Sequence, residues 1–154
     1  MSTAAKLLSV VVPVHNAERS LTQRIGRLLE VLPDLVAKFE VLIVDDGSTD
    51  QTEDVALELS QQYPQVRVTR HPKQRGIEAS AQTGAAHTTG DVVIVHAGHE
   101  PVNASQLQRA WQHRKEEGVV VAPIGSKVEW RGLNERNGAS HRCQLPNSQG
   151  NTGG

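Results

Sequence analysis

The stretch from residue 41 to residue 50, VLIVDDGSTD, constrains the fold more than any other part of the chain. It begins with a short apolar run rich in β-branched residues, which indicates a strand buried on both faces, as in a parallel sheet. The run ends at two adjacent carboxylates, Asp45 and Asp46. Because a charge is costly to bury inside a strand, we expect both acids at its carboxyl end, where open α/β sheets place their ligands. Taken alone, the two acids are also compatible with an ordinary solvated turn.

Apolar runs alternate with amphipathic segments along most of the chain. The first amphipathic segment places Leu21, Ile25 and Leu28 at helical spacing, and Pro33 is expected to end that helix. Ser48 or Thr49 can cap the next helix, and Ser48 with Gln51 or Asp50 with Glu53 has the spacing of a capping box or close to it. Strands are predicted at 7–14, 41–44, 66–69, 92–95, 119–122 and 127–131, and helices at 18–32, 50–63, 77–87 and 105–117. This order predicts an α/β fold, with a mostly parallel sheet, helices on both faces and right-handed crossovers.

Composition restricts the cellular setting and the class of partner. The formal net charge is -1 and the cationic residues are scattered, which argues against nucleic acid as a partner. The one cysteine, Cys143, allows no internal disulfide, and the first apolar run is too short for a transmembrane segment, so we expect a cytoplasmic protein. From residue 132 the chain is rich in Gly, Asn, Ser and Gln. We therefore expect one domain over residues 1–131 and a flexible polar tail over residues 132–154.

Three motifs occur in a fixed order along the predicted domain: VVVPVHNAE after the first strand, EVLIVDDGSTDQT after the second, and QRGIEASAQTGAAHTTGD before the fourth. The first strand is not followed by G-x-G-x-x-G, and neither a P-loop nor a G-x-S-x-G nucleophile elbow is present. From Leu7 to Ala122 the sequence resembles the nucleotide-binding half of a family 2 glycosyltransferase. That resemblance implies a GT-A fold, which is Rossmann-like.

The resemblance also implies nucleotide-binding roles for eight residues in three loops. They are Pro13, His15, Asn16 and Glu18 beside the nucleobase and ribose, Asp45 and Asp46 as acceptors from the base edge or ribose, and Arg75 and Gly76 near the diphosphate. A carboxylate accepts strong charge-assisted hydrogen bonds, and a guanidinium binds phosphate in a bidentate way. Two alternatives stay open, because His15 is equally compatible with an ordinary loop residue and Arg75 with a solvated surface arginine.

The sequence departs from the family pattern where an Asp-x-Asp metal motif is expected. In that register Ala97 stands at the first Asp and His99 at the second, followed by Glu100. One interpretation is that His99 and Glu100, with or without His96, hold a divalent cation such as Mn²⁺ or Mg²⁺, or a softer Zn²⁺, against a diphosphate. The other is that the site has lost its metal, and its catalysis with it.

Two functions follow from the resemblance. The first is an enzyme that binds a nucleotide-diphospho-sugar, with a UDP-sugar favoured, and transfers the sugar to an acceptor with inversion. The second is a catalytically inactive, truncated transferase domain that senses a nucleotide sugar or serves as an interaction scaffold. A nucleotidyltransferase of related fold is a weaker third reading. No residue can be assigned as the acceptor-side base, since the acids after Ala122 are Glu129 and Glu135, outside any recognisable motif. A homodimer that covers an exposed sheet edge is a further hypothesis.

Overall fold

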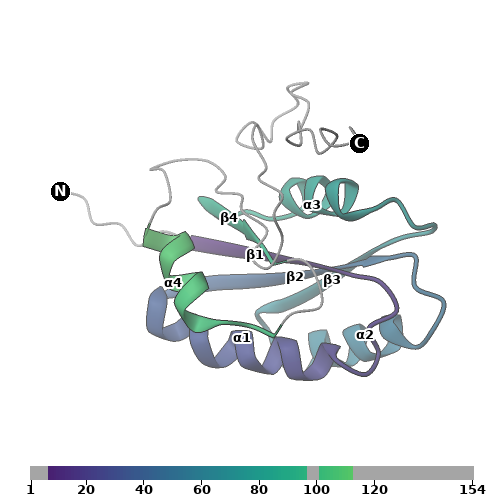
Figure 1. Ribbon diagram of the computed structural model, residues 1–154, viewed down its shortest axis with the longest axis horizontal. Helices are drawn as coiled ribbons and strands as arrows, with labels where there is room; N and C mark the ends of the chain where they lie inside the picture. Colours follow the sequence, from purple (N-terminus) through teal and green to yellow (C-terminus); the bar gives the residue numbers. More distant parts are fainter. Residues whose placement is uncertain (1–6, 97–100, 113–154) are drawn as a thin grey trace, which may run out of the picture.

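The computed structural model describes residues 7–96 and 101–112, and it forms a parallel sheet covered by helices on both faces (Figure 1). The strands are β1 (Leu7–Val14), β2 (Lys38–Asp46), β3 (Val66–His71) and β4 (Val92–Val95). Their order in the sheet is β3-β2-β1-β4, and every pairing is parallel. The predicted α/β architecture is therefore confirmed. The strands expected at 119–122 and 127–131 and the tail at 132–154 lie outside the described residues.

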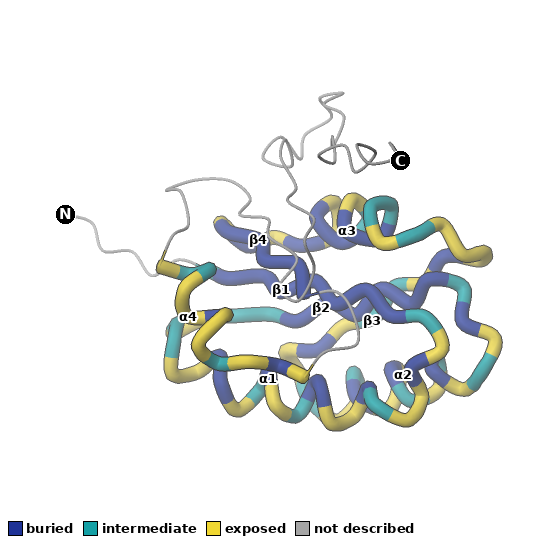
Figure 2. The backbone as a smooth tube through the Cα atoms, in the orientation of Figure 1, coloured by how far each residue is buried: buried dark blue, intermediate teal, exposed yellow. Residues whose placement is uncertain are grey.

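Helices cover the two faces of the sheet unequally. The helices are α1 (Leu21–Leu35), α2 (Thr52–Gln62), α3 (Ile77–Ala86) and α4 (Ala104–Gln112). In Figure 1, α1 and α2 lie on one face with α4 against α1, and α3 lies on the other. Strands β1 and β4 and the carboxyl-terminal part of β2 are almost wholly buried between these layers, whereas the edge strand β3 and the outer sides of the helices are partly exposed (Figure 2). None of the described helices is long and apolar enough to cross a membrane.

Alternate residues of β1 explain how the two faces are filled. Val10 and Val12 belong to the aliphatic cluster beneath α1 and α2, while Val11 faces α3. A Cβ atom on Gly84 of α3 would lie 2.2 Å from Cγ1 of Val11. A glycine in the last turn of α3 therefore allows the helix to pack directly on the sheet, at some loss of helix propensity.

Two local predictions were wrong. Pro33 lies inside α1, which continues to Leu35, because the last turn is closed by a hydrogen bond from the Val36 N–H to the Leu32 carbonyl, 3.1 Å long, that does not need the proline nitrogen. Neither Ser48 nor Thr49 caps α2; instead Asp50 Oδ1 accepts from the Thr52 N–H at 2.9 Å. The Ser48 hydroxyl is engaged elsewhere, accepting from the Asn16 N–H at 2.8 Å.

Candidate functional site

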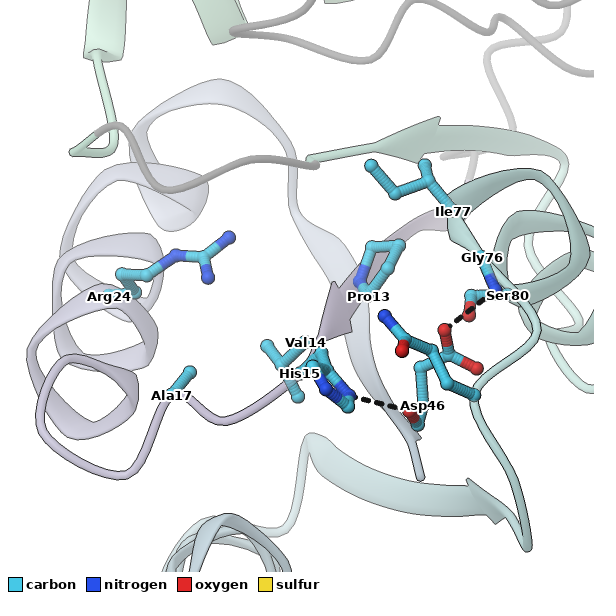
Figure 3. A pocket seen from close by; sticks show the side chains of 10 residues that line it. Pro13, Val14, His15, Ala17, Arg24, Asp46, Gly76, Ile77 and Ser80 are labelled. Atoms are coloured by element: carbon cyan, nitrogen blue, oxygen red, sulfur yellow. Dashed lines mark hydrogen bonds between the residues drawn. The ribbon is translucent and has the colours of Figure 1, made fainter. Parts of the chain in front are cut away.

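A cavity of about 220 Å³ opens beside the carboxyl end of β1, between α1 and the start of α3 (Figure 3). The sheet order places β4 on the opposite side of β1 from β2 and β3, so this end of β1 is the point where the chain order reverses. Ligands of open α/β sheets bind at such switch points. The lining residues are Pro13, Val14, His15, Ala17, Arg24, Asp46, Gln74, Gly76, Ile77 and Ser80. Four of the eight residues predicted to bind the nucleotide are among them, namely Pro13, His15, Asp46 and Gly76.

Asp46 links the second and third motifs at the cavity wall. Its Oδ1 accepts hydrogen bonds from His71 Nδ1 and from the Arg75 N–H, both at 2.8 Å, and its Oδ2 accepts from the Gly76 N–H at 2.8 Å. Burial alone would raise the pKa of the Asp46 carboxyl, but these donors outweigh it and hold the pKa below its usual value. The carboxylate therefore closes the loop between β3 and α3 onto the end of β2. A carboxylate offers about four acceptor sites, so this one retains capacity for a ligand donor.

Asp45 is fully buried and does not line the cavity. Its Oδ2 accepts from Arg70 Nη1 at 3.1 Å and its Oδ1 accepts from the Ser48 N–H at 3.1 Å. Direct contact between Asp45 and a nucleotide stays a prediction, and it would require the surrounding groups to move, because Asp45 is 0% exposed. In the structure as it stands, Asp45 shapes the turn behind the cavity.

The loop between β1 and α1 is fixed to the loop between β2 and α2. Asn16, in the left-handed region with a φ of 51°, accepts through Oδ1 from the Thr49 N–H at 2.8 Å. His15 Nδ1 donates to the Asp46 carbonyl at 2.8 Å, as Figure 3 shows, and Glu18 Oε1 accepts from the Gln51 N–H at 3.3 Å. Of these residues only His15 lines the cavity. Asn16 and Glu18 hold the two motifs together, and their contact with a nucleotide stays a prediction.

Arg75 contributes its backbone to the site. Its N–H binds Asp46, while its side chain is exposed and is absent from the cavity lining. Contact between its guanidinium and a diphosphate therefore stays a prediction, and the surface-arginine alternative also stays open.

Arg24 is a site residue that sequence reasoning missed. It lies on α1 and is 5% exposed. Its Nη2 donates a hydrogen bond, 3.2 Å long, to Nδ1 of His96, the residue that directly follows β4. Burial and, after it, the positive charge of Arg24 lower the pKa of His96 to about 4, so the imidazole is neutral and its Nδ1 is the acceptor. A signal was available in the sequence: Arg24 follows Leu21 by three residues and precedes Leu28 by four, which places a charge on the apolar face of the helix.

The buried histidine predicts a measurable acid sensitivity. The unfolded chain takes up a proton on His96 near its ordinary pKa of 6.5, whereas the folded chain takes it up only near 4. The contribution of the neutral His96 to the free energy of unfolding is therefore fully present above pH 6.5 and falls as the pH drops toward 4. Between pH 7 and pH 5 the loss is about 2 kcal/mol. The variant His96→Gln keeps an acceptor for Arg24 but does not titrate. We therefore expect its free energy of unfolding to fall by about 2 kcal/mol less between pH 7 and pH 5 than that of the unaltered chain. Urea unfolding at both pH values measures the difference, and equal losses in the two proteins would contradict the assignment.

The predicted metal ligands cannot be placed at this site. His99 and Glu100, like Ala97, lie outside the described residues. The residues that the structure describes contain no group of three or more His, Cys, Asp or Glu side chains able to hold a metal ion. His96 faces the Arg24 guanidinium through Nδ1, so only its Nε2 is left to face a cation, and its role as a ligand stays a prediction.

The chain is similar in sequence and in fold to known glycosyltransferases. Dolichyl-phosphate beta-glucosyltransferase ALG5A of Trichomonas vaginalis is 33% identical over 97 residues, covering 60% of this chain and 30% of that protein. The mannosyltransferase PcManGT of Pyrobaculum calidifontis, solved with GDP-Man and Mn²⁺, superposes with a TM-score of 0.62 at 22% identity, over 73% of this chain and 34% of that one. TarS of S. aureus, residues 1–349, solved with UDP, gives a TM-score of 0.51 at 26% identity, over 67% and 30% of the two chains.

These similarities confirm the predicted GT-A-like fold. The chain spans about a third of the length of each of these three proteins, so most of each of them lies outside the region of similarity. The model of the family described as Glycosyl transferase family 2 matches residues 9–150, nearly the whole sequence. The chain belongs to glycosyl transferase family 2.

Proposed function

We propose that this chain binds a nucleotide-diphospho-sugar in the cavity at the carboxyl end of β1, with a UDP-sugar as the favoured donor. The observation that carries the proposal is the convergence of Pro13, His15, Asp46 and Gly76, from three separate motifs, on one cavity at the switch point of the sheet. Its volume of about 220 Å³ is enough for part of such a ligand, and we propose that the rest extends out of the cavity. Family membership and the solved neighbours that hold GDP-Man and UDP support the same class of ligand.

Transfer of the sugar to an acceptor with inversion is the activity that we propose for this protein. In this reading the cavity holds the donor, and the acceptor approaches from the open side. The base that deprotonates the acceptor hydroxyl is still unassigned. The chain spans only part of the length of its relatives, so membership of the family does not by itself assign the acceptor or the complete reaction to this chain. A second copy of the chain paired along an exposed edge strand stays a hypothesis, against which a monomeric mass in solution would count.

A second function is favoured by one observation in the sequence. Ala97 stands where the family pattern expects the first metal-binding Asp, and alanine has no ligand atom in its side chain. A domain that binds the nucleotide sugar without turning it over, as a sensor or scaffold, would keep the cavity and lose this ligand. Release of UDP from a UDP-sugar separates the two functions, because a sensor binds the donor without releasing UDP.

Calorimetric titration with UDP, GDP and UDP-glucose, each with and without Mn²⁺, tests the binding proposal. We expect UDP and UDP-glucose to bind more tightly than GDP. An affinity that increases with Mn²⁺ would support a divalent cation at His99 and Glu100, and Mg²⁺ in place of Mn²⁺ would test its selectivity. If none of the three nucleotides binds under either condition, the proposal is wrong.

A further inference from the structure

Two buried polar atoms at the cavity lack a hydrogen-bond partner within the described part of the chain. They are Nε of Arg24 and Oγ of Ser80, and both residues line the same cavity. Figure 3 places Arg24 on the α1 side of the cavity and Ser80 on the α3 side. Buried N–H and O–H groups are almost always satisfied in folded proteins, because an unsatisfied one destabilises the fold by about 1–3 kcal/mol. Two such atoms around one cavity indicate a ligand with acceptor oxygens.

The charge of Arg24 points to an anion. A buried guanidinium normally pairs with a carboxylate, because an uncompensated buried charge is strongly unfavourable. Among the described residues no ion pair includes Arg24, and its hydrogen-bond acceptors are Nδ1 and the carbonyl oxygen of His96. The imidazole of His96 is neutral and so cannot balance the charge.

The remaining wall of the cavity is compatible with a negative ligand. The one acid among the lining residues is Asp46, whose carboxylate already faces donors from His71, Arg75 and Gly76. Helix α3 begins beside the cavity, since Gly76 is its N-cap residue, and the amino end of a helix carries a partial positive charge. Arg24 therefore supplies a full positive charge opposite the start of a helix.

We propose that Arg24 binds a phosphate group in this cavity, with the hydroxyl of Ser80 as a second donor. The identity of the ligand rests on the function proposed above, in which the phosphate belongs to the diphosphate of the nucleotide sugar. A planar guanidinium suits this role because it donates two parallel hydrogen bonds to phosphate oxygens. Arg24 then compensates diphosphate charge with a fixed cation of the protein itself.

The test compares Arg24→Met with the unaltered chain by calorimetry in EDTA, using UDP, uridine and inorganic pyrophosphate as probes. Methionine retains most of the volume and removes the charge, so the packing of α1 is kept while the uncompensated buried charge is lost. We expect Arg24→Met to lower the affinity for UDP and for pyrophosphate by about tenfold or more, the equivalent of one charge-assisted hydrogen bond. The affinity for uridine, which has no phosphate, is expected to stay the same. Arg24→Lys, which keeps the charge, is expected to recover part of the UDP affinity.

The matched control is Arg27→Met, one turn further along α1, where an exposed arginine pairs with Glu30 at 3.2 Å. It is expected to leave the affinity for all three probes unchanged. Equal UDP affinity in Arg24→Met and the unaltered chain would overturn the inference while the proposed function stands. Arg24-dependent binding of pyrophosphate without binding of UDP would support the anion site and overturn the proposed function. If Arg24→Met lowers the affinities for UDP and uridine equally, Arg24 has a structural role and the inference is wrong. The inference is also wrong if the unaltered chain binds none of the three probes.

Discussion

Asp46→Asn is expected to abolish nucleotide binding and to lower the free energy of unfolding by about 3 kcal/mol, the value of one or two charge-assisted hydrogen bonds. The carboxylate of Asp46 accepts from three N–H groups, two of them in the backbone of the loop between β3 and α3. Asparagine has a single acceptor oxygen, and its amide nitrogen would face one of those donors. The loop that carries Gly76 would then move away from the cavity. Urea unfolding and calorimetric titration with UDP measure the two effects.

The same substitution at Asp91 is the matched control. Asp91 accepts from the Leu7 N–H at 2.9 Å at the opposite end of the sheet, so Asp91→Asn changes a carboxylate without touching the cavity. UDP affinity is expected to stay the same in this variant. A normal UDP affinity in Asp46→Asn would show that the nucleotide binds elsewhere.

The pH dependence of Asp46→Asn adds an independent check. Because hydrogen bonding lowers the pKa of Asp46 in the folded chain, its contribution to stability is complete above the ordinary pKa of an unfolded aspartate. That contribution is lost as the pH falls through the lower, folded pKa. The unaltered chain should therefore lose more stability in acid than Asp46→Asn does. Parallel acid profiles of the two proteins would contradict the network around Asp46.

The sheet was predictable because its strands are short, continuous apolar runs. A run such as Val92–Val95 is too short for a helix and contains β-branched residues alone, and the structure buries all four residues. The alternation of these runs with helices then favours parallel pairing without knowledge of any contact. Periodicity also predicted the buried face of α1, where Leu21, Ile25 and Leu28 are fully buried.

The chemistry at the strand ends was only partly predictable. The sequence places Asp45 and Asp46 at the end of β2, but it does not indicate what lies beside them. The structure extends β3 to Arg70 and His71 and sets these residues in register with the two acids. Strand register depends on pairing between segments that are distant in sequence, so a motif confined to one loop does not reveal it. Both acids consequently have protein partners that motif reasoning could not supply.

Gly47 provides the second large effect, because Gly47→Ala is expected to lower the free energy of unfolding by about 3 kcal/mol. The φ of Gly47 is +69°, a left-handed conformation that destabilises alanine by about 1–2 kcal/mol. An added Cβ would also lie 2.5 Å from the backbone nitrogen of Gln74 and 2.6 Å from the carbonyl carbon of Lys73, and overpacking of this kind adds about 1–3 kcal/mol. Backbone atoms cannot rotate aside, so the loop before α3 must shift as a whole.

The shift gives Gly47→Ala a functional consequence that a core substitution would lack. Moving residues 73 and 74 also displaces Arg75 and Gly76, whose N–H groups bind Asp46, so we expect the affinity for UDP to fall together with stability. Gly26→Ala is the matched control: it lies within α1 with nothing within 4 Å of the added Cβ. It should raise stability by about 0.5–1 kcal/mol, through helix propensity, and leave UDP affinity unchanged. If Gly47→Ala keeps normal UDP affinity despite its lower stability, the closed loop is needed for the fold and not for the ligand.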